Sequence, residues 1–143
     1  MEVKTTKAAQ TKKIAYDLAK SLKGGEVIAI YGDLGVGKTI FTQGLAKGLG
    51  IKGRILSPTF VFMRTYAFKK SGKEMTLYHI DLYRGQDWQD FENLGLEEVF
   101  SEGSVVVLEW AEKIQKILPK KRIEVYIRQT GEKNRSITIK IKK

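Results

Sequence analysis

Eight consecutive residues near the start of the chain have the types and spacing of a phosphate-binding loop. Residues 32–39 read GDLGVGKT, which matches the pattern G-x-x-x-x-G-K-[ST]. Glycines at these places let successive backbone N–H groups turn toward phosphate oxygens, and a helix that begins there adds partial positive charge. Lys38 would place its ammonium group on the β- and γ-phosphates of a nucleotide, and Thr39 would offer its hydroxyl to Mg²⁺.

The segments on both sides of the loop favour the same interpretation. Residues 27–31, VIAIY, form an apolar run rich in β-branched residues, which is typical of a buried strand. Residues 39 to about 49 have a helical pattern that ends at Gly48 or Gly50. A chance match to the loop pattern in a chain this short has a probability of about one per cent at average glycine frequency. The strand–loop–helix context therefore predicts nucleotide binding.

A loop of this kind needs a carboxylate for its metal ion, usually at the end of a neighbouring strand. Two apolar runs end in an acid: VVVLE ends in Glu109, and LYHID ends in Asp81. Most Asp and Glu residues are exposed, so either acid alone could be a surface or capping residue. Beside the loop, at least one of them is expected to serve Mg²⁺, and the residue types leave both open.

Three further residues could take part in nucleotide chemistry, and each has a plainer alternative. Thr59, in Ser-Pro-Thr, could sense a γ-phosphate or belong to an ordinary turn. His79 could carry a proton or be structural, since phosphoryl transfer depends on positioning more than on a strong base. Trp110 could lie beside the nucleotide or a partner, or pack in the core.

Hydrophobic periodicity predicts an α/β fold, in which a mixed β-sheet is flanked by helices. The expected helices are residues 6–22, 39–49 and 111–118, with a broken helix at 87–100. The expected strands are residues 27–31, 61–68, 75–80, 105–108, 123–128 and 136–141. Turn residues, including Gly72, predict antiparallel hairpins at about 61–80 and 123–141. Thr5 or Thr6 is the expected N-cap of the first helix.

The composition excludes several classes of protein. The 143 residues include no cysteine and one histidine, which excludes a disulfide framework, a thiolate zinc site and a cysteine nucleophile. The length suits a single domain, expected to span residues 1–143, whose core needs no cross-links. No apolar run approaches the ~20 residues of a membrane span, and no signal peptide is evident, so a cytoplasmic location is expected.

The net charge is strongly positive and unevenly distributed. The formal charge is +10, from 26 Lys and Arg against 16 Asp and Glu. Residues 1–78 carry 14 basic and 5 acidic residues, residues 79–112 carry 1 and 9, and residues 113–143 carry 11 and 2. The basic segments could be solvated faces or could approach nucleic acid, and the total charge does not choose between these.

The order of several motifs resembles the TsaE family. These motifs are GDLGVGKT at 32–39, SPTF at 57–60, HIDLYR at 79–84, LGLEE at 94–98, LEWAEKI at 108–114 and LP at 118–119. The loop alone is unspecific, whereas its combination with SPTF, HIDLYR and LEWAE is very specific and covers essentially the whole chain. The family consists of bacterial P-loop ATPases of tRNA threonylcarbamoyladenosine biosynthesis, so the resemblance implies a P-loop NTPase domain.

The resemblance implies an accessory ATPase whose hydrolysis of ATP is weak without its partners. The family acts with the TsaD–TsaB complex, in which TsaD transfers a threonylcarbamoyl group to N6 of adenosine 37 in tRNAs that read ANN codons. TsaE does not perform that transfer; its ATP cycle supports turnover of the complex. Contact with tRNA would therefore be indirect, through the complex.

The resemblance also implies roles for particular residues. The residues that would wrap the phosphates are Leu34, Gly35, Val36, Gly37, Lys38 and Thr39. Thr39 and Glu109 would hold Mg²⁺, Asp81 would be needed for hydrolysis, and Thr59 would belong to a switch-like segment. Trp110 fits the family's aromatic position after the glutamate. The adenine contact would fall near residues 7–11, where the match is too loose to assign a residue.

Two other functions compete with this hypothesis. A small-molecule kinase would usually carry an arginine-rich lid, but residues 79–112 hold a single arginine, Arg84. The sequence shows no dedicated arginine finger; Arg84 could serve as an internal one, and a structural ion pair is its plainer interpretation. A non-enzymatic RNA binder would suit the charge, but the aromatic residues do not alternate with basic ones along the sequence as a stacking platform would require.

Overall fold

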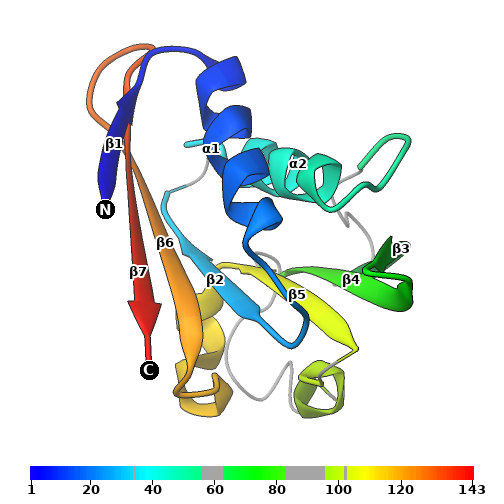
Figure 1. Ribbon diagram of the computed structural model, residues 1–143. Coiled ribbons are helices and arrows are strands. Elements are labelled where there is room, and N and C mark those ends of the chain that lie inside the picture. Colours follow the sequence, from blue (N-terminus) through cyan, green and yellow to red (C-terminus); the bar gives the residue numbers. More distant parts are fainter. Residues whose placement is uncertain (34, 56–62, 83–95, 102) are drawn as a thin grey trace.

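The computed structural model describes residues 1–33, 35–55, 63–82, 96–101 and 103–143 (Figure 1). In this part of the chain, seven strands form one sheet in the order β1-β7-β6-β2-β5-β4-β3. The strands are β1 (Glu2–Thr5), β2 (Val27–Tyr31), β3 (Met63–Lys70), β4 (Lys73–Asp81), β5 (Ser104–Glu109), β6 (Arg122–Gln129) and β7 (Arg135–Lys142). The helices are α1 (Ala8–Lys20), α2 (Lys38–Gly48) and two 3₁₀ helices, η2 (Leu96–Val99) and η3 (Ala111–Ile117).

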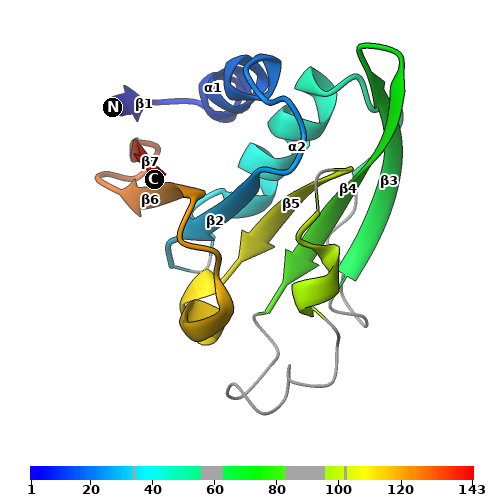
Figure 2. The same cartoon turned by 60° about the horizontal axis from the view of Figure 1, so that its bottom comes forward.

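The four central strands, β6, β2, β5 and β4, run parallel to one another. Their burial follows from their composition: β5 is buried throughout, and only Tyr31 of β2 is partly exposed. Such apolar strands need a covering layer on both faces. Figure 2 shows α1 and α2 on one side of the sheet and η3 on the other. The parallel arrangement brings the carboxyl ends of β2, β4 and β5 to one edge of the sheet.

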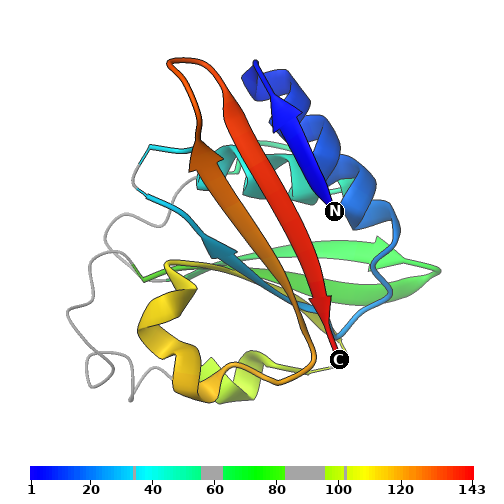
Figure 3. The same ribbon diagram turned by 90° about the vertical axis from the view of Figure 1, so that its left-hand side faces the viewer.

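Both outer parts of the sheet are antiparallel hairpins, as the sequence predicts. Strands β3 and β4 are joined through Ser71 and Gly72, which have φ angles of 53° and 77°. Two consecutive positive φ angles are typical of a tight hairpin turn. At the other end, β6 pairs with β7 in register from Arg122 to Gln129. Figure 3 shows β6, β7 and β1 side by side, without a helix in front of them.

Strand β1 was not predicted from the sequence. Its four residues, EVKT, are too few and too polar to show a strand pattern, and pairing with β7 is what orders them. The N-terminal amine adds a hydrogen bond to the carbonyl of Ile139 at 3.1 Å. Short edge strands of this kind depend on their neighbour for stability.

The first helix begins later than expected, and its predicted cap is wrong. Lys7 is the N-cap, and Oε1 of Gln10 accepts hydrogen bonds from the backbone N–H of Thr6 at 2.6 Å and of Lys7 at 3.2 Å. Gln10 is thus the N3 residue of a capping box, and its side chain accepts a hydrogen bond from the backbone N–H of the N-cap. Thr5 is instead the buried last residue of β1. Thr6 lies one residue before the N-cap, and its backbone N–H donates to the side chain of Gln10.

Two other predicted helices differ from expectation. Residues 111–118 were predicted as a short helix, and the structure has a 3₁₀ helix there, with a kink at Ile114. The broken helix predicted at 87–100 lies largely outside the described residues, and its end forms η2. No helix within the described ranges is both long and apolar enough to cross a membrane.

Candidate nucleotide and metal site

The candidate site lies where β2, β4 and β5 end. Asp81 and Glu109 occupy opposite places in the β4–β5 register, and Ile30 pairs with Glu109 across the β2–β5 register. The glycine-rich loop, residues 32–39, follows β2 directly and leads into α2. Side chains alternate along a strand, so His79, Asp81 and Glu109 share the sheet face that α2 covers. The strand register therefore places these three residues, each discussed as a candidate from the sequence, together near the start of α2.

Close packing and backbone conformation explain two of the loop glycines. A Cβ on Gly32 would lie 2.5 Å from the carbonyl oxygen of Ile127, so any larger residue would force the loop away from β6. Gly37, the residue before α2, has a φ angle of 109°, which L side chains rarely adopt. These positions put Lys38 and Thr39 in the first turn of α2, where the N-terminal end of the helix favours an anion.

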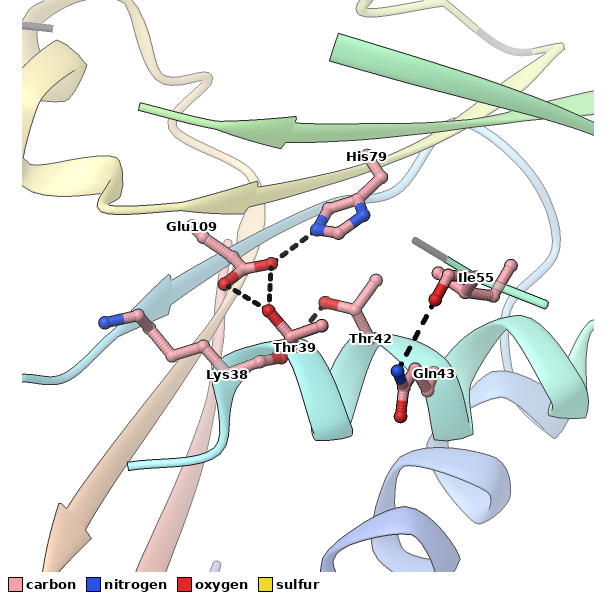
Figure 4. Close-up of polar contacts among 7 residues, drawn as sticks. All are labelled: Lys38, Thr39, Thr42, Gln43, Ile55, His79 and Glu109. Carbon is pink, nitrogen blue, oxygen red and sulfur yellow. Dashed lines mark hydrogen bonds and ion pairs between the residues drawn. The ribbon is translucent and has the colours of Figure 1, made fainter. Parts of the chain in front are cut away.

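A chain of hydrogen bonds runs from α2 to β4 through Glu109 (Figure 4). The hydroxyl of Thr39 donates to the Glu109 carboxylate, with Oγ1 3.2 Å from Oε1 and 3.4 Å from Oε2. On the other side, Nε2 of His79 contacts Oε2 of the same carboxylate. Glu109 is 2% exposed and His79 is fully buried. A buried carboxylate needs such partners, and here they come from the two elements on either side of it.

The sequence alone leaves the role of His79 open. In the structure, His79 holds the carboxylate of Glu109, a predicted site residue. Its Nδ1 is buried and has no hydrogen-bond partner among the described residues. With a carboxylate on Nε2, the neutral ring carries its proton on that nitrogen, because a carboxylate can only accept. The proton position follows from this hydrogen-bond chemistry. His79 thus fixes the orientation of Glu109.

Lys38 extends along the loop, and its ammonium group is held by backbone carbonyls. Nζ donates to the carbonyl oxygens of Gly32 and Asp33, the latter at 3.0 Å. Nζ also lies 3.7 Å from the ring centroid of Trp110, a cation–π distance. Burial lowers the pKa of Lys38 from its usual value, and the nearby negative charge of Glu109 opposes that effect. The lysine is only 5% exposed, although it carries a charge.

The contact with Lys38 places Trp110 beside the glycine-rich loop. Trp110 has a φ of 62°, so the chain turns sharply after Glu109 and directs the indole toward the loop. Of the alternatives left open by the sequence, proximity to the candidate nucleotide loop is the one that this contact favours. Trp110 also packs against the apolar cluster beneath η3, so the core alternative holds in part.

Arg135 is a residue of this region that the sequence did not reveal. It is the first residue of β7, and its Nε donates to the carbonyl oxygen of Val36 at 3.1 Å. The bond spans 99 positions of the chain, so no local pattern indicates it. Arg135 thereby ties the glycine-rich loop to the β6–β7 hairpin. Its only sequence signal is its place immediately before the predicted strand 136–141.

Several predicted residues are not placed by these contacts. Leu34, Thr59 and Arg84 lie outside the described residues. Asp81 ends β4 opposite Glu109 and is partly exposed. Ile55, the last described residue before 56–62, is linked to α2, since Nε2 of Gln43 donates to its carbonyl oxygen at 3.4 Å (Figure 4).

The donor atoms at this place fit a magnesium ion. Mg²⁺ prefers oxygen ligands and is usually held by one or two protein groups together with phosphate oxygens and water. The Thr39 hydroxyl and the Glu109 carboxylate are such ligands, and they already lie 3.2 Å apart. Within the described ranges, no group of three or more His, Asp and Glu side chains offers an alternative all-protein site.

Comparison with known proteins decides the family. The sequence matches the family described as Threonylcarbamoyl adenosine biosynthesis protein TsaE over residues 5–137. The chain belongs to the TsaE family. The match covers all elements that build the candidate site, from α1 to the middle of β7.

Individual TsaE relatives cover most of the chain. The tRNA threonylcarbamoyladenosine biosynthesis protein TsaE of Bacillus subtilis is 41% identical over 135 residues, which are 94% of this chain and 82% of the relative. The TsaE protein of Treponema pallidum is 37% identical over 122 residues, 85% of this chain and 87% of the relative. The crystal structure of Bacillus subtilis YdiB has a TM-score of 0.81 at 37% identity, covering 100% of this chain and 86% of that one. The mixed α/β fold is thus shared with a solved structure.

Proposed function

We propose that this chain is a Mg²⁺-dependent ATPase with a P-loop NTPase domain. The observation that carries the proposal is the contact between Thr39 and Glu109. The loop threonine and the strand-end carboxylate come from segments 70 residues apart, yet their oxygens lie 3.2 Å from each other. A threonine after the loop lysine and an acid at the end of a neighbouring strand are the two protein groups that such enzymes use for magnesium.

Each residue of the site has a proposed part in ATP binding. The backbone of residues 34–39 would surround the phosphates, and Lys38 would neutralise charge on them. Trp110 would lie beside the bound nucleotide, because its ring already contacts the ammonium group of Lys38. Thr39 and Glu109 would hold Mg²⁺, which when bound neutralises negative charge on the β- and γ-phosphates.

The proposed reaction is attack of water on the γ-phosphorus of ATP, in line with the leaving ADP. A bond forms between the water oxygen and phosphorus, while the bond from phosphorus to the β–γ bridging oxygen breaks. The bonding electron pair leaves with ADP, and a proton of the water passes to solvent. Asp81, at the end of β4 opposite Glu109, would orient the water, and Thr59 would belong to the segment that responds to the γ-phosphate.

The names of the relatives support a role in tRNA modification. Bacterial relatives of this family are named tRNA threonylcarbamoyladenosine biosynthesis proteins. We infer that the chain acts in the cytoplasm as an accessory subunit of a TsaD–TsaB assembly and does not itself transfer the threonylcarbamoyl group. Without an arginine finger in the described part of the site, hydrolysis by the chain alone should be weak.

The proposal is tested by measuring ATP hydrolysis by the purified chain, with and without TsaD and TsaB from the same organism. Hydrolysis should be slow alone, should require Mg²⁺ and should rise in the complex. The exposed residue Lys116 provides a matched control, because Lys116→Ala removes the same charge as Lys38→Ala from η3, outside the glycine-rich loop. Fast hydrolysis that the partners leave unchanged would contradict the accessory role, and faster phosphate transfer to a nucleoside panel than to water would indicate a kinase.

A further inference from the structure

A basic hollow lies at the end of α2 opposite the candidate site. Its volume is about 700 Å³, and it is lined in part by Lys12 of α1, Lys47 of α2 and the following residues Lys52 and Arg54. None of the described residues that line it is acidic. Thr39 and Lys47 are eight residues apart on the same helix, which corresponds to about 12 Å. The hollow is therefore separate from the nucleotide loop.

The four cations of the basic hollow have no countercharge within the described part of the chain. All four side chains are exposed, and none of them makes an ion pair with another residue that the structure describes. By contrast, the neighbouring Lys13 pairs with Asp17 at 2.9 Å. Like charges around one hollow repel each other and raise the local positive potential. Such an arrangement favours a negatively charged ligand.

Helix capping does not account for these cations. Lysines near the C-terminal end of a helix can bond its last carbonyls. Here the backbone N–H of Gly50 donates to the carbonyl of Lys47 at 3.0 Å, and that of Ile51 donates to the carbonyl of Ala46 at 3.0 Å. This Schellman pattern satisfies the helix end with backbone groups alone. The helix dipole favours Lys47 slightly, but it does not explain Lys12 in the first half of α1.

The contact between α1 and α2 brings the cations together. A Cβ on Gly44 would lie only 2.4 Å from the carbonyl oxygen of Lys12, so the two helices meet at van der Waals contact there. Lys47 follows Gly44 by three positions and lies on the same side of α2. The positions of Lys12 and Lys47 thus depend on buried packing, although their side chains are solvated.

We propose that the basic hollow binds the phosphodiester backbone of RNA. Its size and its four cations exceed what one phosphate group needs, and they match a ligand with several phosphates in a row. A protein partner would be expected to meet aromatic residues or methionine at the centre of an interface, and the described lining of the hollow contains neither. Contacts from lysine and arginine to phosphate position a nucleic acid without reading its sequence.

This site goes beyond the proposed ATPase, because it gives the chain a direct contact with RNA. The test uses an unmodified, fluorescein-labelled tRNA transcript and the whole chain, with anisotropy measured between about 50 and 200 mM salt. The hollow variant combines Lys47→Ala, Lys52→Ala and Arg54→Ala. The control variant combines Lys4→Ala, Lys140→Ala and Lys143→Ala, three exposed cations outside the hollow.

The hollow variant should bind tRNA roughly tenfold to a hundredfold more weakly, and its salt slope should fall by about two to three. The control variant should change affinity less than about threefold, although both variants lose the same charge. Equal weakening in both variants would show an effect of net charge only and would overturn the site. Absence of tRNA binding by the parent chain would overturn it as well.

Two further measurements separate this proposal from others. Nucleotide affinity and the melting temperature of the hollow variant should match those of the parent, since neither the loop nor the core is changed. A hollow variant that binds tRNA normally but no longer joins TsaD–TsaB would show that the hollow takes an acidic protein surface, which overturns the RNA site. Failure of ATP hydrolysis in the parent would contradict the proposed ATPase without affecting tRNA binding.

Discussion

Nε2 of His79 and the carboxylate of Glu109 form a fully buried hydrogen bond between neighbouring strands β4 and β5. The two residues are 30 positions apart, and Glu109 reaches onward to the hydroxyl of Thr39. A histidine that orients a metal-binding carboxylate resembles the outer-shell partners that tune metal sites. His79 is therefore proposed as a positioning residue for the proposed magnesium site.

The first prediction separates the two ring nitrogens of His79. Glutamine can place an N–H donor near the position of Nε2, whereas asparagine is shorter and places its donor near Nδ1. We expect His79→Gln to retain most of the Mg²⁺ dependence of ATP hydrolysis and His79→Asn to raise the Mg²⁺ concentration needed for half-maximal rate by about 10- to 100-fold. Hydrolysis measured across a magnesium titration gives this value.

A structural role for His79 alone would give a different result. In that case both variants would lose thermal stability, and the Mg²⁺ requirement of the remaining active protein would not move. Binding of a fluorescent ADP analogue in the presence of EDTA should be equal in the parent and in both variants, since His79 makes no hydrogen bond to the described residues of the glycine-rich loop. A weaker nucleotide affinity without metal would contradict the positioning role.

The second prediction concerns the choice between Glu109 and Asp81. Glu109→Ala should lower Mg²⁺-dependent hydrolysis on the order of 100-fold, because bound magnesium contributes several kcal/mol to the reaction. It should also leave His79 and Thr39 without their shared partner, so Glu109→Gln is the better-tolerated comparison. Asp81→Asn should lower the maximal rate without changing the Mg²⁺ requirement. The reverse pattern would assign the metal to Asp81.

The glycine-rich loop and the two acids could be predicted because their signals are local. Residues 32–39 follow a strand directly and precede a helix, and each acid ends an apolar run. The parallel register of β4 and β5 then places Asp81 and Glu109 opposite each other. Eight neighbouring residues suffice for the loop pattern, and tertiary structure only has to bring the ends of the strands together.

The remaining contacts could not be predicted because they join distant segments. The pairing of His79 with Glu109 requires knowing which strands are adjacent, and the bond from Arg135 to the loop spans 99 positions. Strand β1 could not be predicted from the sequence for the same reason, since its four residues are ordered by pairing with β7. Cations of the basic hollow are likewise brought together only by the packing of α1 on α2.

The third prediction uses the contact between Lys38 and Trp110. A nucleotide phosphate near Lys38 should draw the ammonium group of Lys38 away from the indole ring of Trp110. This should change the fluorescence emission of Trp110. The chain has two tryptophans, so the measurement is made in a Trp88→Phe background. ADP should change the fluorescence of Trp110 in this background, and the change should be lost in Lys38→Ala but kept in Lys116→Ala. An unchanged spectrum at saturating ADP would place the nucleotide away from Trp110.

The fourth prediction concerns the link between Arg135 and the loop. The guanidinium group donates to the carbonyl of Val36, which lies inside the phosphate-binding pattern. Arg135→Gln should weaken nucleotide binding by roughly 5- to 30-fold, the equivalent of about 1–2 kcal/mol for one hydrogen bond from a charged donor. Lys140→Gln on the same strand is the matched control, because this exposed cation lies five residues further along β7, away from Val36. Equal losses in both variants would indicate a general charge effect.

The fifth prediction tests the helix contact that orders the basic hollow. Replacing a helical glycine with alanine usually stabilises a protein by about 0.5–1 kcal/mol. At Gly44 the new Cβ would lie 2.4 Å from the carbonyl oxygen of Lys12, and a backbone atom cannot move aside as a flexible side chain can. Gly44→Ala should therefore lower the free energy of unfolding by about 1–3 kcal/mol.

Gly103 offers a control for this substitution. A Cβ there meets no atom within 4 Å, and its backbone does not require glycine, so Gly103→Ala should change stability by less than about 0.5 kcal/mol. Urea denaturation followed by circular dichroism measures both values. If Gly44→Ala proved as stable as the parent, α1 and α2 would not be held at the close distance that places Lys12 beside Lys47. A loss of tRNA affinity in Gly44→Ala, measured where the variant remains folded, is expected from the same displacement.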